Sequence, residues 1–217
     1  MLSREGRWWG SRSERGDAGR LEAFSDGVLA IAITLLILEV RVEQSAGQSL
    51  ADALGHALPE IAAYAASFLQ IGIMWANHHA LFRVVDRVDQ LLLMLNLLLL
   101  ASVSFLPLPT RLVAEHLDSG ADARTAALLY CGTLTLSALA FNLIWQRVAR
   151  GNLLVEGVST EFVRDIDVRY LLGLGAYAAA TLLALVLPTV ALGLTVVLAL
   201  MFALGPSPRP AFSTPSG

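Results

Sequence analysis

Long runs of apolar residues divide the chain into six segments separated by shorter polar stretches. An α-helix needs roughly 20 apolar residues to cross a hydrocarbon core about 30 Å thick, and these segments reach or approach that length. The pattern therefore predicts an all-α integral membrane protein with six transmembrane helices. Their approximate ranges are 23–42, 58–80, 90–110, 124–147, 169–187 and 189–205.

The two ends of the chain lack this apolar pattern. Residues 1–19 mix arginine, glycine, serine and acidic residues without helical periodicity, and residues 206–217 are rich in proline and serine. Such compositions bury too little apolar surface to offset the entropy of ordering and are typical of disordered tails. We expect one six-helix transmembrane domain, residues 20–205, between two disordered tails.

The charge distribution predicts how the helices are oriented. Hydrophobic residues make up 56% of the chain and charged residues 15%, well below the quarter typical of soluble domains. All 15 basic residues are arginine, and 12 of them lie in the two tails and in the second and fourth loops. Arg41, Arg111 and Arg124 alone lie on the other face. Under the positive-inside rule both termini are cytoplasmic, which requires an even number of spans.

Several classes of protein are disfavoured by the same composition. A net charge of −3 does not favour nucleic-acid binding, and the lone cysteine, Cys131, permits no disulfide within the chain. The first apolar segment is too long for a signal peptide and no small-residue cleavage site follows it. We find no nucleophile–base set and no metal-ligand spacing, so we predict no enzyme activity, catalytic residue, metal or cofactor.

The start of the first apolar segment carries polar residues. Ser25 and Asp26 stand in the string FSDG, and Arg20 lies just upstream. An ionisable group inside a span is costly, so it usually faces the bundle interior or a water-filled path. Two interpretations of Asp26 stay open: a buried contact with another helix, or an interfacial carboxylate that is hydrated or caps the helix.

A helical wheel places an apolar stripe opposite Asp26. At 100° per residue, its members lie about 120° to 200° from Asp26, at spacings that alternate between four and three residues. They are Phe24, Val28, Ile31, Leu35 and Leu38. Parallel helices bring such a stripe to a common axis, so Ser25 and Asp26 should point away from that axis into neighbouring helices. Thr34, at about 80°, lies at the edge of the stripe.

The end of the second segment, WANHHALF (residues 75–82), adds two adjacent histidines. If the first helix runs outward and the second returns, Asp26 and these histidines lie at the same cytoplasmic depth. We expect a hydrogen-bonded cluster among Asp26, Arg20 and one of His78 and His79, because such a cluster offsets the cost of desolvation. Interfacial histidines without a special role are the alternative. Adjacent histidines point about 100° apart on a helix and are a poor chelating pair.

Other polar residues within the spans are expected to serve helix packing. Asn96, Ser102 and Ser104 in the third segment more often form interhelical hydrogen bonds than line a permeation path. Pro107 and Pro109 should stop or kink that helix near its external end. The segment 148–168 carries charges of both signs and reads as a cytoplasmic linker with a short surface helix.

Together these motifs resemble the signature of the transmembrane protein 175 family of potassium-permeable channels. The resemblance rests on Arg20, three residues, FSDG and a run ending in TLLILE, followed by the WxxHHxLF pattern from Trp75 to Phe82. It covers about residues 20–110, whereas the last three segments agree only in number and hydrophobicity. Members occur in animal endolysosomes and in the plasma membranes of bacteria and archaea.

The resemblance implies a homotetramer of six-helix subunits in the lipid bilayer, with the first helix of each lining a central pore for potassium ions. The family has no TVGYG-type filter, and this sequence has none. An isoleucine three residues before the motif's threonine constricts the pore instead, followed by apolar residues one and two turns on. These positions correspond to Ile31, Leu35 and Leu38. The residues that hold the first helix against its neighbours correspond to Arg20, Ser25, Asp26, His78 and His79.

We therefore expect a potassium-permeable cation channel in the plasma membrane, weakly to moderately selective for potassium. Its gate would be the hydrophobic constriction, which excludes water when narrow and admits ions when the first helices splay. The alternative is a proton-coupled or small-solute secondary transporter with Asp26 and His78 as titrating groups. A carrier would show inverted repeats or broken helices at the midplane, and the sequence shows neither. No sequence feature supports a non-transporting scaffold.

Overall fold

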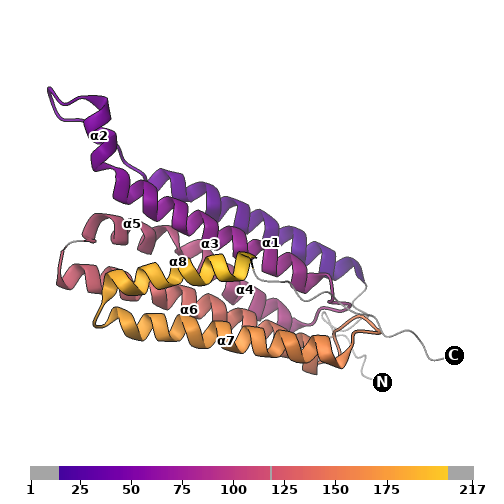
Figure 1. Ribbon diagram of the computed structural model, residues 1–217. Helices are drawn as coiled ribbons and strands as arrows, with labels where there is room; N and C mark the ends of the chain where they lie inside the picture. The colour runs from indigo at the N-terminus through magenta and orange to yellow at the C-terminus, as the bar shows by residue number, and fades with distance from the viewer. Residues whose placement is uncertain (1–14, 118, 205–217) are drawn as a thin grey trace, which may run out of the picture.

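The computed structural model describes residues 15–117 and 119–204, and these fold as an elongated bundle of helices that run up and down (Figure 1). A 3-10 helix continues the first helix, and a short helix precedes the third. The elements are α1 (Arg15–Leu35), η1 (Leu36–Glu39), α2 (Leu50–His56), α3 (Leu58–Phe82), α4 (Gln90–Phe105), α5 (Pro107–His116), α6 (Ala121–Arg150), α7 (Thr160–Ala184) and α8 (Pro188–Leu204).

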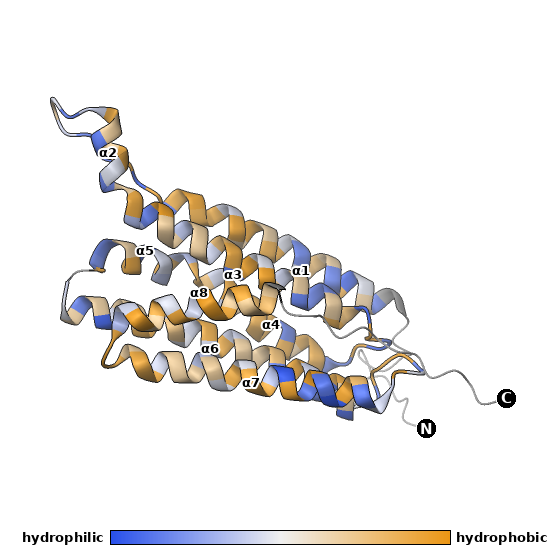
Figure 2. Cartoon of the chain, in the orientation of Figure 1, coloured by the Kyte–Doolittle hydropathy of each residue, from blue (hydrophilic) through white to orange (hydrophobic). Residues whose placement is uncertain are grey.

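The connections between helices lie at the two ends of the bundle. Figure 1 shows α2 and the α5–α6 and α7–α8 turns at one end, and the start of α1 with the α3–α4 and α6–α7 connections at the other. Hydrophilic residues gather toward these ends, while the middle of each helix is apolar (Figure 2). This distribution matches a bundle whose middle lies in hydrocarbon and whose ends meet water.

Four segments are long and apolar enough to cross a membrane: Asp17–Glu39, Gln90–His116, Ala121–Arg150 and Thr160–Ala184. The α2–α3 pair, bent by 54° at its break, makes a fifth if it counts as one span. The last helix, α8, is apolar but has only 17 residues. The described residues thus hold four to five candidate spans by length and composition, in an all-helical fold.

The third apolar segment breaks at its prolines. Because Pro107 has no N–H, the carbonyl oxygen of Val103 accepts a hydrogen bond from the Leu106 N–H instead, at 3.1 Å. The Thr110 hydroxyl donates to the carbonyl oxygen of Leu106 at 2.8 Å. The carbonyl oxygens of Val103 and Leu106 at the break therefore have hydrogen-bond partners within the segment. The segment Gln90–His116 still qualifies as one span.

Three helices, α1, α6 and α7, extend further than composition indicated. The first, α1, begins at Arg15, inside the segment 1–19 that we expected to be a tail, and Asp17 in its first turn suits a helix amino terminus. Likewise α6 runs to Arg150 and α7 starts at Thr160, so only residues 151–159 connect them. The remaining tail predictions, for residues 1–14 and 205–217, lie outside the described residues.

The α6–α7 connection pairs with the α3–α4 connection. An antiparallel bridge joins Val85 to Leu154, and the Asp86 N–H donates to the carbonyl oxygen of Leu153 at 2.8 Å. The short surface helix expected in this linker is absent from residues 151–159 because their backbone is engaged with the neighbouring connection.

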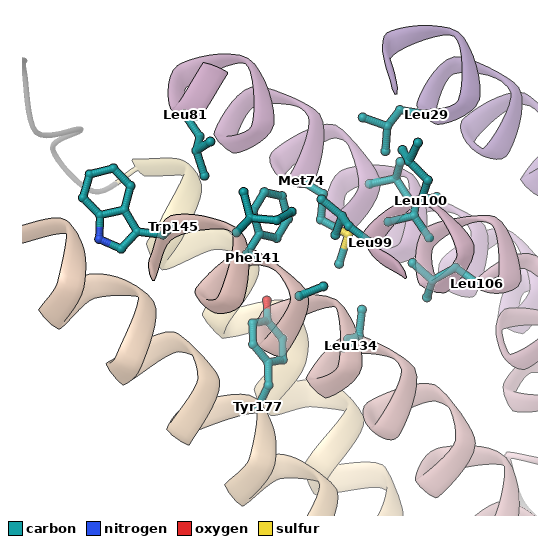
Figure 3. Close-up of a cluster of buried hydrophobic side chains, with 14 of the residues drawn as sticks. Leu29, Met74, Leu81, Leu99, Leu100, Leu106, Leu134, Phe141, Trp145 and Tyr177 are labelled. Carbon is teal, nitrogen blue, oxygen red and sulfur yellow. The ribbon is translucent and has the colours of Figure 1, made fainter. Parts of the chain in front are cut away.

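The core of the bundle is centred on α6, which packs against α4, α5, α7 and α8, while α1 packs against α3 and α4. Figure 3 shows part of the buried apolar cluster, including Leu99, Leu134 and Trp145. Polar contacts accompany this packing: the Trp145 Nε1–H donates to Asp167 at 2.6 Å, and the Ser102 and Ser137 hydroxyls lie 2.8 Å apart.

Asp89 ties the start of α4 to the end of α6. Its carboxylate caps α4 by accepting from the Leu92 N–H at 2.8 Å and accepts from the Arg147 Nε–H at 2.9 Å. Burial acts to raise the pKa of the Asp89 carboxyl group. The hydrogen bonds from Arg147 and Leu92, together with the guanidinium charge, outweigh that effect, so its pKa lies below the usual value.

We predict that Asp89→Asn lowers the free energy of unfolding by about 0.2–1 kcal/mol near neutral pH, since both partners are partly exposed. A carboxyl group with a depressed folded-state pKa stabilises the fold above its unfolded pKa of about 3.9, and this contribution disappears as the pH falls through the folded-state value. Thermal unfolding of the purified protein across acidic pH should therefore show a smaller loss of stability for Asp89→Asn than for the wild type. Asp165→Asn, an exposed aspartate outside this contact, is the matched control.

Candidate pore-lining face and its polar anchor

The first helix and its 3-10 extension have one face that is buried and another that is exposed. One face is buried against α3 and α4 and comprises Leu21, Ser25, Leu29, Ala32 and Leu36. The other is apolar yet exposed, with Phe24, Ile31, Leu35 and Leu38 as its large side chains. Val28, the remaining member of the predicted stripe, is half-buried. A continuous apolar face of this kind indicates a contact surface outside the single subunit.

All three residues predicted for the constriction lie on the exposed face. Ile31 and Leu35 are 60% and 42% exposed in α1, and Leu38 is 67% exposed in η1. Because η1 is wound more tightly than an α-helix, the angle that a wheel at 100° per residue gives for Leu38 does not apply. The position of Leu38 on the exposed face therefore comes from the structure. Thr34 is also exposed, and its hydroxyl donates to the carbonyl oxygen of Ile31 at 2.9 Å, so its proton is directed into the helix backbone.

Behind this face, a buried chain of hydrogen bonds joins three helices. Ser25 on α1 accepts from the Asn96 Nδ2–H at 2.9 Å, and Asn96 Oδ1 on α4 accepts from His78 Nε2 on α3 at 2.9 Å. The Ser25 hydroxyl donates to the carbonyl oxygen of Leu21 at 2.9 Å. All three side chains are buried, and the donor role of His78 requires its proton on Nε2. The anchor of α1 therefore needs no charged group for any of these hydrogen bonds.

The ionisable groups of the two motifs lie at the edge of this chain. The indole Nε1–H of Trp75 donates to Asp26 Oδ1 at 3.0 Å. His79 Nδ1 lies 2.7 Å from Glu22 Oε1, and its ring stacks on that of Trp75 at 6.2 Å between centroids. Asp26 is half-buried and His79 exposed, so both keep access to polar surroundings.

The five residues that the motifs grouped in one network thus take different positions. Ser25 and His78 belong to the buried chain, whereas Asp26 and His79 take part in separate contacts with Trp75 and Glu22. The indole of Trp75 takes the place expected for a histidine beside Asp26. Arg20 is exposed and joins none of these described contacts.

Sequence reasoning did not assign a site role to three of these residues. Asn96 was expected only to aid packing, yet it joins Ser25 to His78; its signal is a single amide within QLLLMLNLLLL. Trp75 and Glu22 belong to the quoted motifs, but residue type alone does not reveal their partners. Among the described residues, no group of three or more His, Cys, Asp or Glu side chains converges as a metal site.

The fold and this site define a multi-pass, all-helical membrane protein whose first helix is anchored by polar residues and carries an exposed apolar face. Residues 20–107 match the family model described as endosomal/lysosomal potassium channel TMEM175. With the similarity to the relatives below, this match shows that the chain belongs to the TMEM175 family.

Known relatives are similar over most of the chain. A potassium channel of Streptomyces collinus is 42% identical over 196 residues, which cover 89% of this chain and 95% of that protein. The crystal structure of a lysosomal potassium-selective channel TMEM175 homologue from Chamaesiphon minutus has a TM-score of 0.79 at 39% identity, covering 87% of this chain and 97% of that one. The endosomal/lysosomal proton channel TMEM175 of Gallus gallus is 38% identical over 136 residues, 58% of this chain but 27% of that protein.

We predict that Asn96→Ala lowers the free energy of unfolding by about 1–3 kcal/mol, because it leaves buried donors and acceptors of Ser25 and His78 without partners. Unfolding in detergent mixtures measures this loss. Ser104→Ala, at an exposed position on the same helix, should change stability little. Equal effects of the two changes would contradict the assignment of Asn96 as the anchor.

Proposed function

We propose that the chain is one subunit of a homotetrameric potassium-permeable channel in the plasma membrane, with α1 of each subunit lining the central pore. The observation that carries this proposal is the division of α1 and η1 into a buried face holding Ser25 and an exposed apolar face holding Ile31 and Leu38. The Streptomyces relative is a potassium channel and the Chamaesiphon relative a potassium-selective channel, and both support the choice of ion.

Four copies related by a closed rotational symmetry would bring their exposed α1 faces to one axis. Rings of Ile31, Leu35 and Leu38 then form a hydrophobic constriction on that axis. Water leaves such a constriction when it is narrow, and an ion meets a dewetted barrier; a small rotation or splaying of α1 admits water and opens the path. This gate supplies no cage of coordinating oxygens, so the proposed selectivity for potassium over sodium is weak to moderate, with Thr34 at the pore edge.

The anchor sets the position of α1 in this mechanism. The Asp26–Trp75 contact holds α1 from the face opposite the constriction, and the Ser25–Asn96–His78 chain holds it from the side. Because buried hydrogen bonds favour discrete arrangements over continuous sliding, they give α1 a defined resting orientation. Gating is then a movement of α1 relative to α3 and α4.

Six spans with both termini in the cytoplasm are part of the proposal. The start of α1, the arginine-bearing α3–α4 connection and the ends of α6 and α7 that carry Arg150 and Arg164 lie at one end of the bundle, which suits the positive-inside rule. The sixth span is α8, whose 17 residues extend about 26 Å at 1.5 Å per residue. A span this short is accommodated by local thinning of the bilayer.

The alternative of a proton-coupled carrier requires Asp26 and His78 to face a transport path. His78 is buried between helices, with Nε2 engaged by Asn96, and it stacks on Phe82 at 4.4 Å between ring centroids. Asp26 contacts Trp75 rather than a titrating partner. These positions favour structural roles for both residues and therefore support the channel over the carrier.

We predict that Ile31→Asn raises potassium flux into liposomes at least about tenfold, the change produced by lowering the barrier by roughly 1.4 kcal/mol, because an amide ring keeps the constriction wet. The matched control is Ile37→Asn, since Ile37 is 51% exposed but lies outside the predicted stripe. The control should leave flux near the wild-type level.

Native mass spectrometry of both isoleucine variants establishes whether they form tetramers before flux is compared. Wild-type flux through a tetrameric Ile31→Asn variant would rule out the pore assignment. A wild-type protein that is monomeric in the bilayer would rule out the tetramer.

We predict that Asp26→Ala lowers the yield of assembled tetramer while leaving the potassium-to-sodium permeability ratio of the remaining channels unchanged. The reason is that Asp26 contacts Trp75 beside the anchor and not the exposed face of α1. Reversal potentials under potassium and sodium gradients measure the ratio. Trp75→Phe, which keeps the ring and removes the donor, should give a milder assembly defect, and a shifted ratio in a fully assembled Asp26→Ala tetramer would place the carboxylate in the ion path.

A further inference from the structure

A small pocket lies between α3, α6, α7 and α8, away from the exposed face of α1. Its volume is about 60 Å³. Aromatic and aliphatic side chains make most of its wall. Polar groups enter it at four places: Gln70, Asn77, Arg169 and Tyr177.

Gln70 is the central polar group of this pocket. The side chain is 3% exposed, and its Nε2–H donates to the Tyr177 hydroxyl at 2.7 Å. Its other amide atom, Oε1, accepts no hydrogen bond from any described residue. Among the described residues, two side-chain polar atoms are fully buried and have no hydrogen-bond partner. They are Glu60 Oε2 and His78 Nδ1. Gln70 Oε1 is not one of them, so it keeps some accessible surface, and Gln70 is a lining residue of the pocket.

Further hydrogen-bonding capacity faces the same space. The Tyr177 hydroxyl accepts from Gln70, and no described acceptor takes its own proton. Asn77 is half-buried and also has no described side-chain partner. Figure 3 shows the Tyr177 hydroxyl directed toward the part of the cluster where Phe141 and Met74 lie, and both of these residues line the pocket.

Unsatisfied amide and hydroxyl groups are costly here because hydrocarbon offers them no partners. Leaving one such group without a hydrogen bond costs about 1–3 kcal/mol. A cavity needs a volume of roughly 10–15 Å³ to hold one water molecule, which also needs two to four polar partners. The pocket volume of about 60 Å³ therefore admits about four water molecules. An acyl chain would fill the space without offering a hydrogen bond to Gln70 Oε1, the Tyr177 hydroxyl proton or the Asn77 amide.

We propose that this pocket binds a cluster of ordered water molecules that bridges Gln70 and Tyr177 to Asn77 and Arg169. Among the described side chains, the Gln70–Tyr177 hydrogen bond is the one direct link between α3 and α7. The water cluster extends that link, so the contact between α3 and α7 is hydrated rather than closely packed.

A larger cavity in the same subunit provides an internal comparison. It measures about 290 Å³ and lies between the other halves of α3 and α8, above α5 and α6. Its hydroxyl groups already satisfy one another: Ser67 Oγ lies 2.8 Å from Thr110 Oγ1 and 3.1 Å from the Tyr130 hydroxyl. Because these buried hydroxyls already have partners among themselves, water gains few hydrogen bonds by entering, despite the greater volume.

Hydroxyl-radical footprinting of the full-length protein in phosphatidylcholine nanodiscs tests the proposal. Radiolysis generates radicals from bound water, so side chains beside ordered water are oxidised even when bulk solvent does not reach them. Tyr177 and Tyr130 are 7% and 5% exposed, and each shares one hydrogen bond with a side chain of α3. We expect Tyr177 to be oxidised several-fold faster than Tyr130. Equal rates would overturn the proposal.

A variant identifies the pocket as the source of the labelling. Gln70→Leu keeps the approximate volume and removes the amide, so the rate at Tyr177 should fall toward that at Tyr130. Ser67→Ala, on the same helix but in the larger cavity, should leave Tyr177 unchanged. If Gln70→Leu does not assemble, Asn77→Leu serves instead, with a partial decrease expected. An unchanged Tyr177 rate in the assembled variant would overturn the proposal.

Discussion

The structure depends on the requirement that polar groups within hydrocarbon find partners inside the protein. At the anchor of α1 this requirement is met by Ser25, Asn96 and His78, one from each of three helices. None of them needs to carry a charge in this arrangement, so the costliest desolvation is avoided. The ionisable members of the same motifs, Glu22 and His79, pair at the edge of the bundle, where the histidine is exposed.

This separation of polar roles explains why α1 can have two dissimilar faces. The inward face is held by hydrogen bonds of defined length and direction, which fix rotation about the helix axis better than apolar packing does. The outward face can then be entirely apolar, because the rotation of α1 about its axis is already set by the inward face. In the proposed channel, rotation of α1 sets which side chains reach the pore axis, so the anchor and the constriction act through one rigid helix.

The sequence predicted the all-helical class, the two faces of α1 and the break at the prolines because each follows from local pattern. Spacing of apolar residues fixes which positions share a helix face, and proline removes a donor wherever it stands. The partners of Asp26, Glu22 and Asn96 were not predictable in this way. They depend on the rotation of α3 and α4 about their own axes, and nearly uniform leucine in α4 provides little apolar asymmetry from which to infer it.

The proposed pore and the proposed hydrated pocket both depend on whether the lining side chains offer hydrogen bonds to water. Large apolar side chains exclude water from the proposed constriction while it is narrow, because they offer water no hydrogen bonds. Gln70 and Tyr177 retain water in a much smaller space because their unused donors and acceptors cost more than ordering the water does. In both proposals the polar atoms that line a narrow space decide whether water stays in it. On this basis a single amide placed at Ile31 is sufficient to change the proposed gate from dry to wet.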